Sequence, residues 1–469
     1  MAIAEPIREH LIGEAPPSPA GPISEEELAG LPSPPLVPLR RAVSVVQFNQ
    51  RQIEYVFRWR RKLGETFRMR GMLPGKPVIT SHPDHVRSLF TARPEDAPSI
   101  TPESPLRPIV GPNSTLTALG DRHMRQRKLL LPPFHGDAIE RYTDMITEVT
   151  EREIDRWPIG RPIQLAPRMQ AITLDVIMSG IFGIEGRPPR GTPEWGLRTA
   201  IRGLIAASTM PGAQIGELMN VGRDEPVGLT KIGMDILDRP TYAVISKRRK
   251  ATDLDTRQDI MSLLMRAQTE DGETLTDHEL RDELLTLVLA GHETTANQLS
   301  WTWERLVRTP HAYDRLRNAV RHDDEAADNV EAAIVEGMRS RPVIPTIGRR
   351  VMVPWQLGEY GVEADRPVIM SVLLVHHRED VYPEPFAFKP ERWLGGRKPG
   401  TYEWIPFGGG IRRCLGAALA MAEQRVVLGA MARRLDLEPD RPEPEHAVHR
   451  NVTMIPGRGG RVVVTRRDG

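Results

Sequence analysis

One long segment near the middle of the chain limits the possible folds more than any other. Residues 277–308 have helical spacing throughout, Thr276 and Glu279 form a capping-box pattern at the start, and Pro310 follows the end. At about 1.5 Å per residue, such a helix is roughly 50 Å long and crosses a whole domain. Its centre, residues 284–290, is apolar on almost every side. We therefore expect this helix to be surrounded by protein.

Polar residues and a glycine follow directly in that apolar centre. Gly291 costs about 1 kcal/mol relative to alanine in a helix interior, and a buried Glu293 carboxylate costs more unless it is paired or hydrated. Sequences break local folding rules mainly where function requires it. The interruption predicts a functional site at mid-helix. A zinc-protease motif beginning at His292 is excluded, because Ala296 stands where the second histidine is needed.

The only cysteine of the chain, Cys414, lies in a segment rich in glycine and arginine. It follows three glycines at 408–410, stands next to Arg412 and Arg413, and precedes helical spacing at 415–434. Positive charge and a helix N-terminus both favour the thiolate over the thiol. By themselves these neighbours leave three roles open, namely an inert buried thiol, an acyl-transfer nucleophile and a metal ligand. A dinucleotide-binding loop is excluded, because Arg413 occupies the position of its next glycine.

Five motifs together resemble those of the cytochrome P450 superfamily. The haem-binding pattern F-x-x-G-x-R-x-C-x-G is matched at every fixed position, by Phe407, Gly410, Arg412, Cys414 and Gly416. The other motifs are the oxygen-activation motif at 290–295, the E-x-x-R motif at 336–339, the P-E-R-W segment at 390–393 and the propionate-binding segment at 123–127. Their order and their spread from about residue 40 to the C-terminus argue against coincidence.

The resemblance implies a haem b (iron protoporphyrin IX) whose iron is bound by the Cys414 thiolate. Phe407 and Gly416 would complete the loop around the sulfur, and Ala290 and Gly291 would face the haem, with Gly291 opening the helix for oxygen and water. The two propionates would be held by a set of basic residues, namely His123, Arg127, Arg412 and Arg349, with Arg350 as the alternative to Arg349.

The resemblance also assigns roles to residues that do not bind the haem itself. Glu293 and Thr294 would be the catalytic acid–alcohol pair, with Thr294 bonding to dioxygen or water and Glu293 relaying protons. A buried ion network of Glu336, Arg339 and Arg392 would hold the segment that leads to the cysteine.

The expected reaction is insertion of one oxygen atom from O2 into a hydrophobic substrate that resembles a lipid, terpene or steroid. Apolar residues predominate in the segments expected to line the distal pocket, which are 96–119, 194–221, 343–347, 451–455 and the helix face at Leu287 and Ala290. Alternatives are a haem-thiolate peroxygenase or isomerase, which would not need the acid–alcohol pair, and a non-enzymatic haem-binding sensor.

Electrons would come from a separate ferredoxin or flavodoxin and its NAD(P)H reductase, because the chain contains no flavin or ferredoxin module. Basic residues expected to flank the thiolate face could bind such an acidic partner; they are Arg122, Arg125, Lys128, Arg413, Arg425, Arg433 and Arg434.

The fold class expected is mainly α with small β-sheets, that is, a cytochrome P450 fold with a helix-rich lobe around haem and a smaller β-rich lobe. Helices are predicted at 83–91, 121–131, 137–157, 174–183, 240–250, 256–268, 277–308, 311–322, 329–339 and 415–434. Strands are predicted at 66–72, 77–80, 350–353, 367–371, 452–454 and 461–464. Residues 1–34, rich in proline, are expected to be partly disordered, and 35–469 to form a single haem domain.

The composition limits the cellular compartment and the classes of partner that we expect. A single cysteine permits no intrachain disulfide, which fits a reducing, cytoplasmic compartment. The formal net charge of +1 gives no overall field that would recruit nucleic acid or an anionic membrane. No apolar run near the N-terminus approaches the roughly 20 residues of a membrane-spanning helix, so no membrane anchor is expected.

Overall fold

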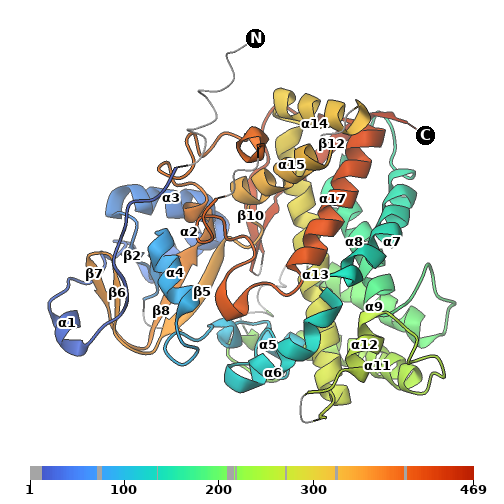
Figure 1. The fold of residues 1–469 in the computed structure, drawn as a ribbon, viewed down its shortest axis with the longest axis horizontal. Coiled ribbons are helices and arrows are strands. Elements are labelled where there is room, and N and C mark those ends of the chain that lie inside the picture. The colour runs from blue at the N-terminus through green and yellow to red at the C-terminus, as the bar shows by residue number, and fades with distance from the viewer. Residues whose placement is uncertain are drawn as a thin grey trace.

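A computed structural model of the chain describes residues 13–70, 76–134, 136–208, 216, 219–269, 272–322, 326–395, 399–450 and 452–468. Helices dominate one lobe, and a smaller lobe holds most of the β-structure (Figure 1). This is the mainly α architecture with small sheets that the sequence predicts. Among the described helices, none has the length and apolar character needed to cross a membrane.

The helix-rich lobe is built around α13 (Asp277–Leu306), which runs through its centre (Figure 1). Thr276 and Glu279 form the predicted capping box at its start. Leu284, Leu285 and Val288 are buried in the main apolar core. The helix packs against α8 (Leu165–Gly180), α15 (Ala326–Ser340) and α17 (Ala417–Arg434). A helix that is apolar around its circumference is thus covered on several sides.

The remaining elements of this lobe surround that helix. They are α5 (Arg107–Val110), α6 (Gly120–Leu130), α7 (Asp137–Ile154), α9 (Pro193–Ser208), α11 (Gly228–Arg249), α12 (Ile260–Arg266) and α14 (Pro310–His322). A three-stranded sheet closes one end, in the order β4 (Pro162–Gln164), β12 (Arg461–Arg467) and β9 (Leu435–Pro439). A hairpin of β10 (Ala447–Arg450) and β11 (Thr453–Pro456) lies beside α13.

The smaller lobe contains a four-stranded sheet in the order β2 (Phe67–Arg68), β3 (Val78–Thr80), β8 (Arg366–Ser371) and β5 (Thr346–Val351). A second sheet joins β1 (Ala20–Pro22), β6 (Trp355–Leu357) and β7 (Tyr360–Val362). The helices of this lobe are α1 (Glu25–Ala29), α2 (Arg41–Gln50), α3 (Gln52–Leu63), α4 (Pro83–Thr91) and α16 (Val372–Val375). β5 pairs antiparallel with β8, which places Arg349 opposite Val368.

Several predicted elements differ from the observed ones at their boundaries. The strand expected at 66–72 is only β2, and residues 71 and 72 lie outside the described residues. The helix expected to start at residue 174 begins earlier, at Leu165. Pro240, taken as a helix start, lies inside α11. Its ring packs against Gly196 of α9, so tertiary packing keeps the helix intact despite the missing N–H.

The N-terminal segment is described from Gly13 onward. Within it, β1 pairs with β6, and Ser24 caps α1 through a complete capping box with Glu27. Residues 1–12 lie outside the described residues, and the expectations for 1–34 and for a single domain over 35–469 stay predictions.

Candidate functional site

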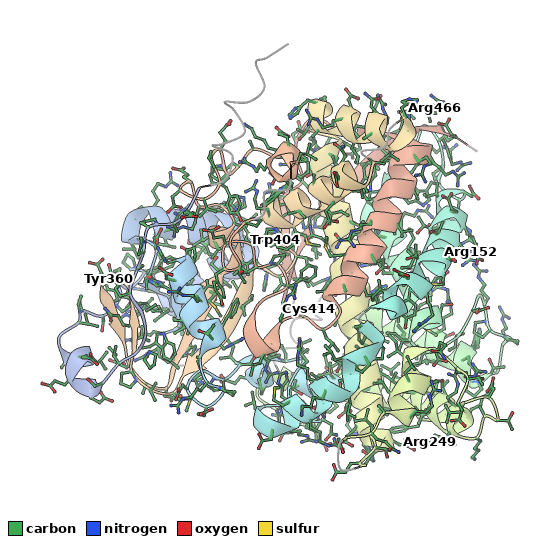
Figure 2. The ribbon with its side chains drawn as sticks, in the orientation of Figure 1. Arg152, Arg249, Tyr360, Trp404, Cys414 and Arg466 are labelled. Carbon is green, nitrogen blue, oxygen red and sulfur yellow. The ribbon has the colours of Figure 1, made fainter. Side chains whose placement is uncertain are left out.

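The loop that carries Cys414 is pressed tightly against α4. Gly410 has a φ of 63°, and a Cβ there would collide with the carbonyl oxygen of Phe90. A Cβ on Gly409 would collide with the Phe90 ring. The Cys414 N–H donates to the Phe407 carbonyl over 2.9 Å, which folds the loop back on itself before α17 begins. The glycines are therefore needed for the close approach to Phe90. Figure 2 shows Cys414 at the loop that precedes α17.

The sulfur of Cys414 has the environment of a metal ligand. The Gly416 N–H donates to it, and the charges of Arg127 and Arg413 also favour the thiolate. Burial is the larger effect and raises the pKa of the thiol above its ordinary value. Cys414 is nevertheless accessible. A sulfur deep in the protein, open on one side and supplied with an N–H donor, is suited to a bound cation that replaces its proton.

Three arginines and a histidine lie near the sulfur loop. Burial first, and then the charges of Arg412, Arg127 and Arg349, lower the pKa of His123 to about 4. Burial lowers the pKa of Arg349 to about 10, and burial with the charges of Arg349 and Arg127 does the same for Arg412. Among the described residues, none of these four forms an ion pair with a carboxylate. We call this set the cation cluster.

The chemistry of the cation cluster fits the two carboxylates of a haem. Buried guanidinium groups that repel one another are stable only when anions compensate them, and carboxylates do so through short, paired hydrogen bonds. His123 and Arg127 come from α6, Arg349 from β5 and Arg412 from the cysteine loop. The site thus draws residues from both lobes and from segments far apart in sequence.

Arg349 and its alternative Arg350 have different surroundings, because neighbouring residues of a strand point to opposite faces. Arg350 donates to Glu103 at 2.7 and 2.9 Å and to Asp365 at 3.0 Å. Arg349 is 5% exposed and lies over the Phe90 ring at 5.6 Å. These contacts favour Arg349 as the member of the cation cluster and leave Arg350 in ion pairs at the surface.

Two adjacent acids of α13 hold the loop that contacts Arg412. Glu283 accepts from the Thr115 N–H at 2.8 Å and from its hydroxyl at 2.6 Å. Asp282 accepts from the N–H and side-chain amide of Asn113 at 3.1 and 2.9 Å. Arg412 in turn donates to the carbonyls of Thr115, at 3.1 Å, and of Ala118. The chain of contacts links α13 to the cysteine loop.

The oxygen-activation segment places two residues on an open face of α13. Ala290 is exposed although most of the helix is buried. The Thr294 hydroxyl, one turn later, donates to the Ala290 carbonyl over 2.6 Å. Gly291 points elsewhere, since a Cβ there would touch Ile177 of α8 at 3.4 Å. The expected opening at Gly291 is not present, because α13 is α-helical without interruption from Asp277 to Leu306.

The Glu293 carboxylate is bound by the β10–β11 hairpin. Arg450 donates to its Oε1 from Nε at 2.8 Å and also from Nη2. The Thr453 hydroxyl lies 3.5 Å from the same oxygen. The side chains of Glu293 and Arg450 are only 23% and 17% exposed, so the pair is partly shielded from solvent.

The predicted ion network is assembled around Glu336. Arg339 donates to both of its carboxylate oxygens at 2.8 Å, and Arg392 Nε lies 3.5 Å from Oε1. The Trp393 indole and the Lys389 N–H donate to the same carboxylate at 3.0 and 2.8 Å. The three charged side chains are fully buried, and among the described residues no ion pair joins them to the cation cluster.

The adjacent histidines His376 and His377, directly after α16, are core residues. The Ile405 N–H donates to His376, and the His377 ring bonds to the Leu373 carbonyl, both over 2.8 Å. Burial, followed by the charge of Arg339, lowers the pKa of His376 to about 3.

Sequence reasoning missed the partners that orient the predicted residues. Arg450, Glu283 and Phe90 belong to no motif, and their sequence neighbours give no signal for the contacts that they make. A partial signal existed for Glu283, because a carboxylate in the otherwise apolar α13 needs a partner.

Comparison with known proteins agrees with this geometry. The profile of the Cytochrome P450 family matches residues 32–461. Cytochrome P450 138 of Mycobacterium tuberculosis is 36% identical over 453 residues, which cover 94% of this chain and 100% of that protein. Cytochrome P450 137 of the same organism is 34% identical and covers 86% of this chain and 83% of its own length.

The fold is shared with solved structures. Retinoic acid-bound cyanobacterial CYP120A1 has a TM-score of 0.77 at 21% identity, covering 92% of this chain and 99% of that chain. The chain therefore belongs to the cytochrome P450 family, whose cofactor is haem with a cysteine thiolate as proximal ligand, and Cys414 is the one cysteine available to supply that thiolate.

Proposed function

We propose that the protein is a monooxygenase that inserts one oxygen atom of O2 into an aliphatic, lipid-like substrate, with electrons from a separate ferredoxin or flavodoxin. The observation that carries this proposal is the open Ala290–Thr294 face of an otherwise buried helix, on which Ala290 is exposed and Thr294 half-buried, in a chain with a single cysteine. A haem carrier or sensor would have no need of an accessible hydroxyl on that helix.

When bound, a thiolate-ligated haem supplies the oxygen-activating chemistry, because the thiolate donates electron density to the iron. The chain's own residues hold it in place. Gly416 N–H and the Arg127 and Arg413 charges favour the thiolate form of Cys414. His123, Arg127, Arg349 and Arg412 would compensate the propionates.

Thr294 and Glu293 would transfer protons. The Thr294 hydroxyl is half-buried and donates its proton to the Ala290 carbonyl, so its oxygen can accept from a water at the open face of α13. Glu293 points to the β10–β11 hairpin, where Arg450 holds its carboxylate. We infer that Glu293 leaves Arg450 to pass a proton toward Thr294 through water, so that the ion pair controls when protons arrive.

Replacing Thr294 with alanine should separate electron consumption from product formation. Without the hydroxyl, a proton is delivered less selectively, and we expect NADPH consumption to continue while most electrons appear as hydrogen peroxide. The matched control is Thr295→Ala, because Thr295 is buried and 4% exposed. Product and peroxide per NADPH are measured for both variants. Unchanged product per electron in Thr294→Ala would make Thr294 a packing residue.

Aliphatic side chains beside the cysteine loop support a lipid-like substrate. Ile100 packs over Gly348, and Ile347 lies next to Gly408. Val110 and Met454, also expected in the pocket, are buried, and Met210 lies outside the described residues. Ile205 instead lines a groove on another side of α13. A screen of fatty acids, terpenes and steroids for a change in haem spin state tests the substrate class.

The surface proposed for the electron donor is smaller than the sequence suggests. Arg125, Arg425 and Arg434 are held by acids of their own chain. Arg122 and Arg413 are exposed and, among the described residues, have no carboxylate partner. Substituting these two with glutamate should slow electron transfer from an acidic ferredoxin and weaken its salt dependence.

The reduced carbon monoxide complex tests the assignment as a haem-thiolate enzyme. The wild-type protein should give the red-shifted Soret band of a thiolate-ligated haem. Cys414→Ser should lose this band and nearly all oxygen insertion, even if haem remains bound. A wild-type spectrum like that of an imidazole-ligated haem would overturn the proposal.

A further inference from the structure

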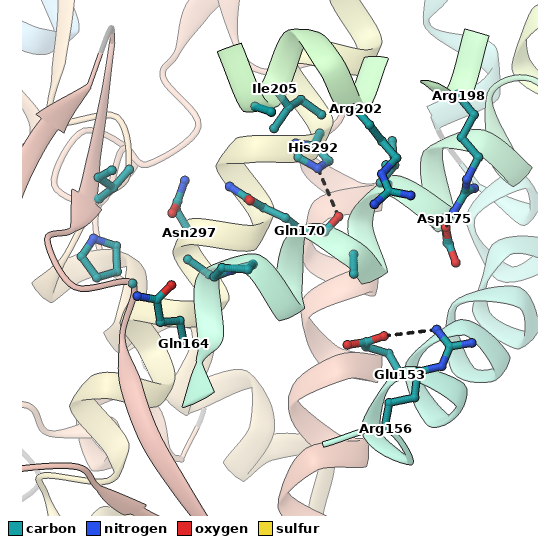
Figure 3. A pocket seen from close by; sticks show the side chains of 18 of the residues that line it. Glu153, Arg156, Gln164, Gln170, Asp175, Arg198, Arg202, Ile205, His292 and Asn297 are labelled. Atoms are coloured by element: carbon teal, nitrogen blue, oxygen red, sulfur yellow. Dashed lines mark hydrogen bonds and ion pairs between the residues drawn. The ribbon is translucent and has the colours of Figure 1, made fainter. Parts of the chain in front are cut away.

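A groove of about 1010 Å³ lies between α7, α8, α9, α13 and the β10–β11 hairpin (Figure 3). Among its lining residues are His292 and Asn297 of α13, which are 3% and 1% exposed. Neither Cys414, Ala290 nor Thr294 lines it. The groove is therefore separate from the haem face of the helix, although part of its lining, such as Ile205 and Ile455, comes from the segments 194–221 and 451–455 that the sequence assigned to the distal pocket.

The lining of this groove is strongly basic. It contains seven arginines and only two acids, in a chain whose net charge is +1. The arginines are Arg152, Arg156, Arg187, Arg198, Arg202, Arg450 and Arg458. Positive charge concentrated in a concave surface raises the local concentration of anions.

The two acids do not neutralise the arginines around them. Asp175 is shared, because Arg198 contacts one of its oxygens and Arg152 lies 3.8 Å from the other. Glu153 is shared in the same way between Arg168 at 3.1 Å and Arg156 at 3.5 Å. Each acid therefore contacts two guanidinium groups, although Arg152 also pairs with Glu148 at 3.0 Å. Arg458 is paired with Asp440 and Glu445, so the excess of positive charge belongs to lining arginines that have no such partner.

Two further arginines carry most of that excess. Arg187, after α8, and Arg202, in α9, are exposed and line the groove, and among the described residues neither has a carboxylate partner. Figure 3 shows the Arg202 side chain directed from α9 into the space beside Asp175. Planar guanidinium groups bind phosphate and carboxylate oxygens in pairs, so such a wall suits an anion with more than one charged group.

We propose that this groove binds a small polyanion of the phosphorylated class, with Arg187, Arg202 and Arg450 as its main contacts. The groove has the size of a small-molecule site. Its apolar floor includes Leu174 and Ile205, which would contact an uncharged part of the ligand.

Arg450 connects this site to Glu293. The same guanidinium lines the groove and binds the Glu293 carboxylate. An anion in the groove therefore competes with Glu293 for Arg450, and by linkage the loss of one competitor strengthens the other. If Glu293 relays protons as proposed above, occupation of the groove would also change the supply of protons, but the competition itself does not depend on that role.

Binding of inorganic pyrophosphate to the haem-loaded protein tests the site. We expect calorimetric binding that weakens about tenfold or more in the double variant Arg187→Ala and Arg202→Ala, relative to wild type at equal ionic strength. The matched control is Arg190→Ala, because Arg190 is an exposed arginine of the same connecting segment and does not line the groove. No binding by wild type, or an equal loss in Arg190→Ala, would overturn the proposal.

Glu293→Gln tests the role of Arg450 without reference to turnover. Removing the competing charge should strengthen pyrophosphate binding several-fold, provided that Arg187 and Arg202 are intact. Unchanged affinity in Glu293→Gln would remove Arg450 from the proposed site. Because both measurements are binding measurements, they can fail while the monooxygenase proposal stands, and the reduced carbon monoxide spectrum can fail while they succeed.

Discussion

Two clusters of arginines, one fully buried and the other partly buried, differ in how their charges are compensated. In one, Arg339 and Arg392 surround Glu336, and their remaining donors go to backbone carbonyls such as His376 and Pro383. The cation cluster, including Arg349 at 5% exposure, has no carboxylate partner among the described residues. Since an uncompensated buried charge is unfavourable, the first cluster stabilises the protein as it stands and the second requires an anionic ligand. Internal pairing therefore distinguishes structural arginines from ligand-binding ones.

Breaking the Glu336 network should have the largest effect. Glu336→Ala leaves Arg339 and Arg392 buried without their acid, which costs about 3–5 kcal/mol of unfolding free energy. We expect the variant to lose haem incorporation as well as stability. Chemical unfolding and the haem-to-protein absorbance ratio measure both effects.

The control for this variant lies on the same helix. Glu331 pairs with Arg425 at the surface, where the side chains are 39% and 49% exposed. Glu331→Ala should therefore change stability by less than about 1 kcal/mol. A soluble Glu336→Ala protein with full haem and normal turnover would refute a structural role for the network.

Removing Arg349 should stabilise the haem-free protein, whereas removing Glu336 should destabilise it. Burial lowers the pKa of Arg349 to about 10, so its charge is unfavourable when no anion compensates it. Arg349→Ala should raise the unfolding free energy of the haem-free protein, by up to about 3 kcal/mol, since one pKa unit corresponds to about 1.4 kcal/mol. In the same variant, haem affinity should fall about tenfold or more.

Arg350→Ala is the matched control for Arg349. Its guanidinium is bound to Glu103 and Asp365, so its loss should lower stability by about 1 kcal/mol or less and leave haem affinity unchanged. Unfolding of haem-free protein and haem transfer to apomyoglobin provide the two readouts. If Arg349→Ala destabilised the haem-free protein as Glu336→Ala does, the distinction between the two clusters would fail.

Sequence alone located most of the helices of this fold, because their apolar periodicity is local. The predicted bounds of α4 are those observed, and the start of α13 follows from its capping box. Among the described elements, sequence missed six strands and the helices α1, α2, α3, α5, α9 and α16. Short strands such as β6 and β7 are stabilised by pairing with distant segments, which periodicity within three residues does not reveal.

For the candidate site, the motifs identified groups but not their surroundings. The haem-binding pattern pointed to Cys414, and the choice between Arg349 and Arg350 depended on which face of β5 each one occupies. The Arg450 contact with Glu293 spans more than 150 residues, and the Phe90 contact with Gly410 more than 300. Such partners depend on the tertiary arrangement of distant segments, so no local pattern encodes them.

Glu283 is a third buried ionisable group, and it differs from both arginine clusters because its hydrogen-bond partners are neutral. Burial, with a smaller opposing effect of Thr115, raises its pKa to about 8 from an ordinary value of 4.5. Between these two pH values the folded protein keeps a proton that the unfolded chain has lost, so this group lowers stability as pH rises from about 4.5 to 8. Glu283→Gln cannot titrate, keeps an acceptor for Thr115 and should remove this dependence.

We expect the unfolding free energy of Glu283→Gln to match that of wild type near pH 5 and to exceed it by about 1–2 kcal/mol at pH 8. This difference is smaller than the full pKa shift implies, because buried sites relax when a charge forms. Urea unfolding across this pH range measures the effect.

Glu423, whose pKa burial also raises to about 8, is the control: Glu423→Gln should change the pH dependence similarly. Of these two acids, only Glu283 bonds to the loop that contacts Arg412, so Glu283→Ala should weaken haem binding and Glu423→Ala should not. Equal haem loss in Glu423→Ala would show that this link does not reach the cation cluster.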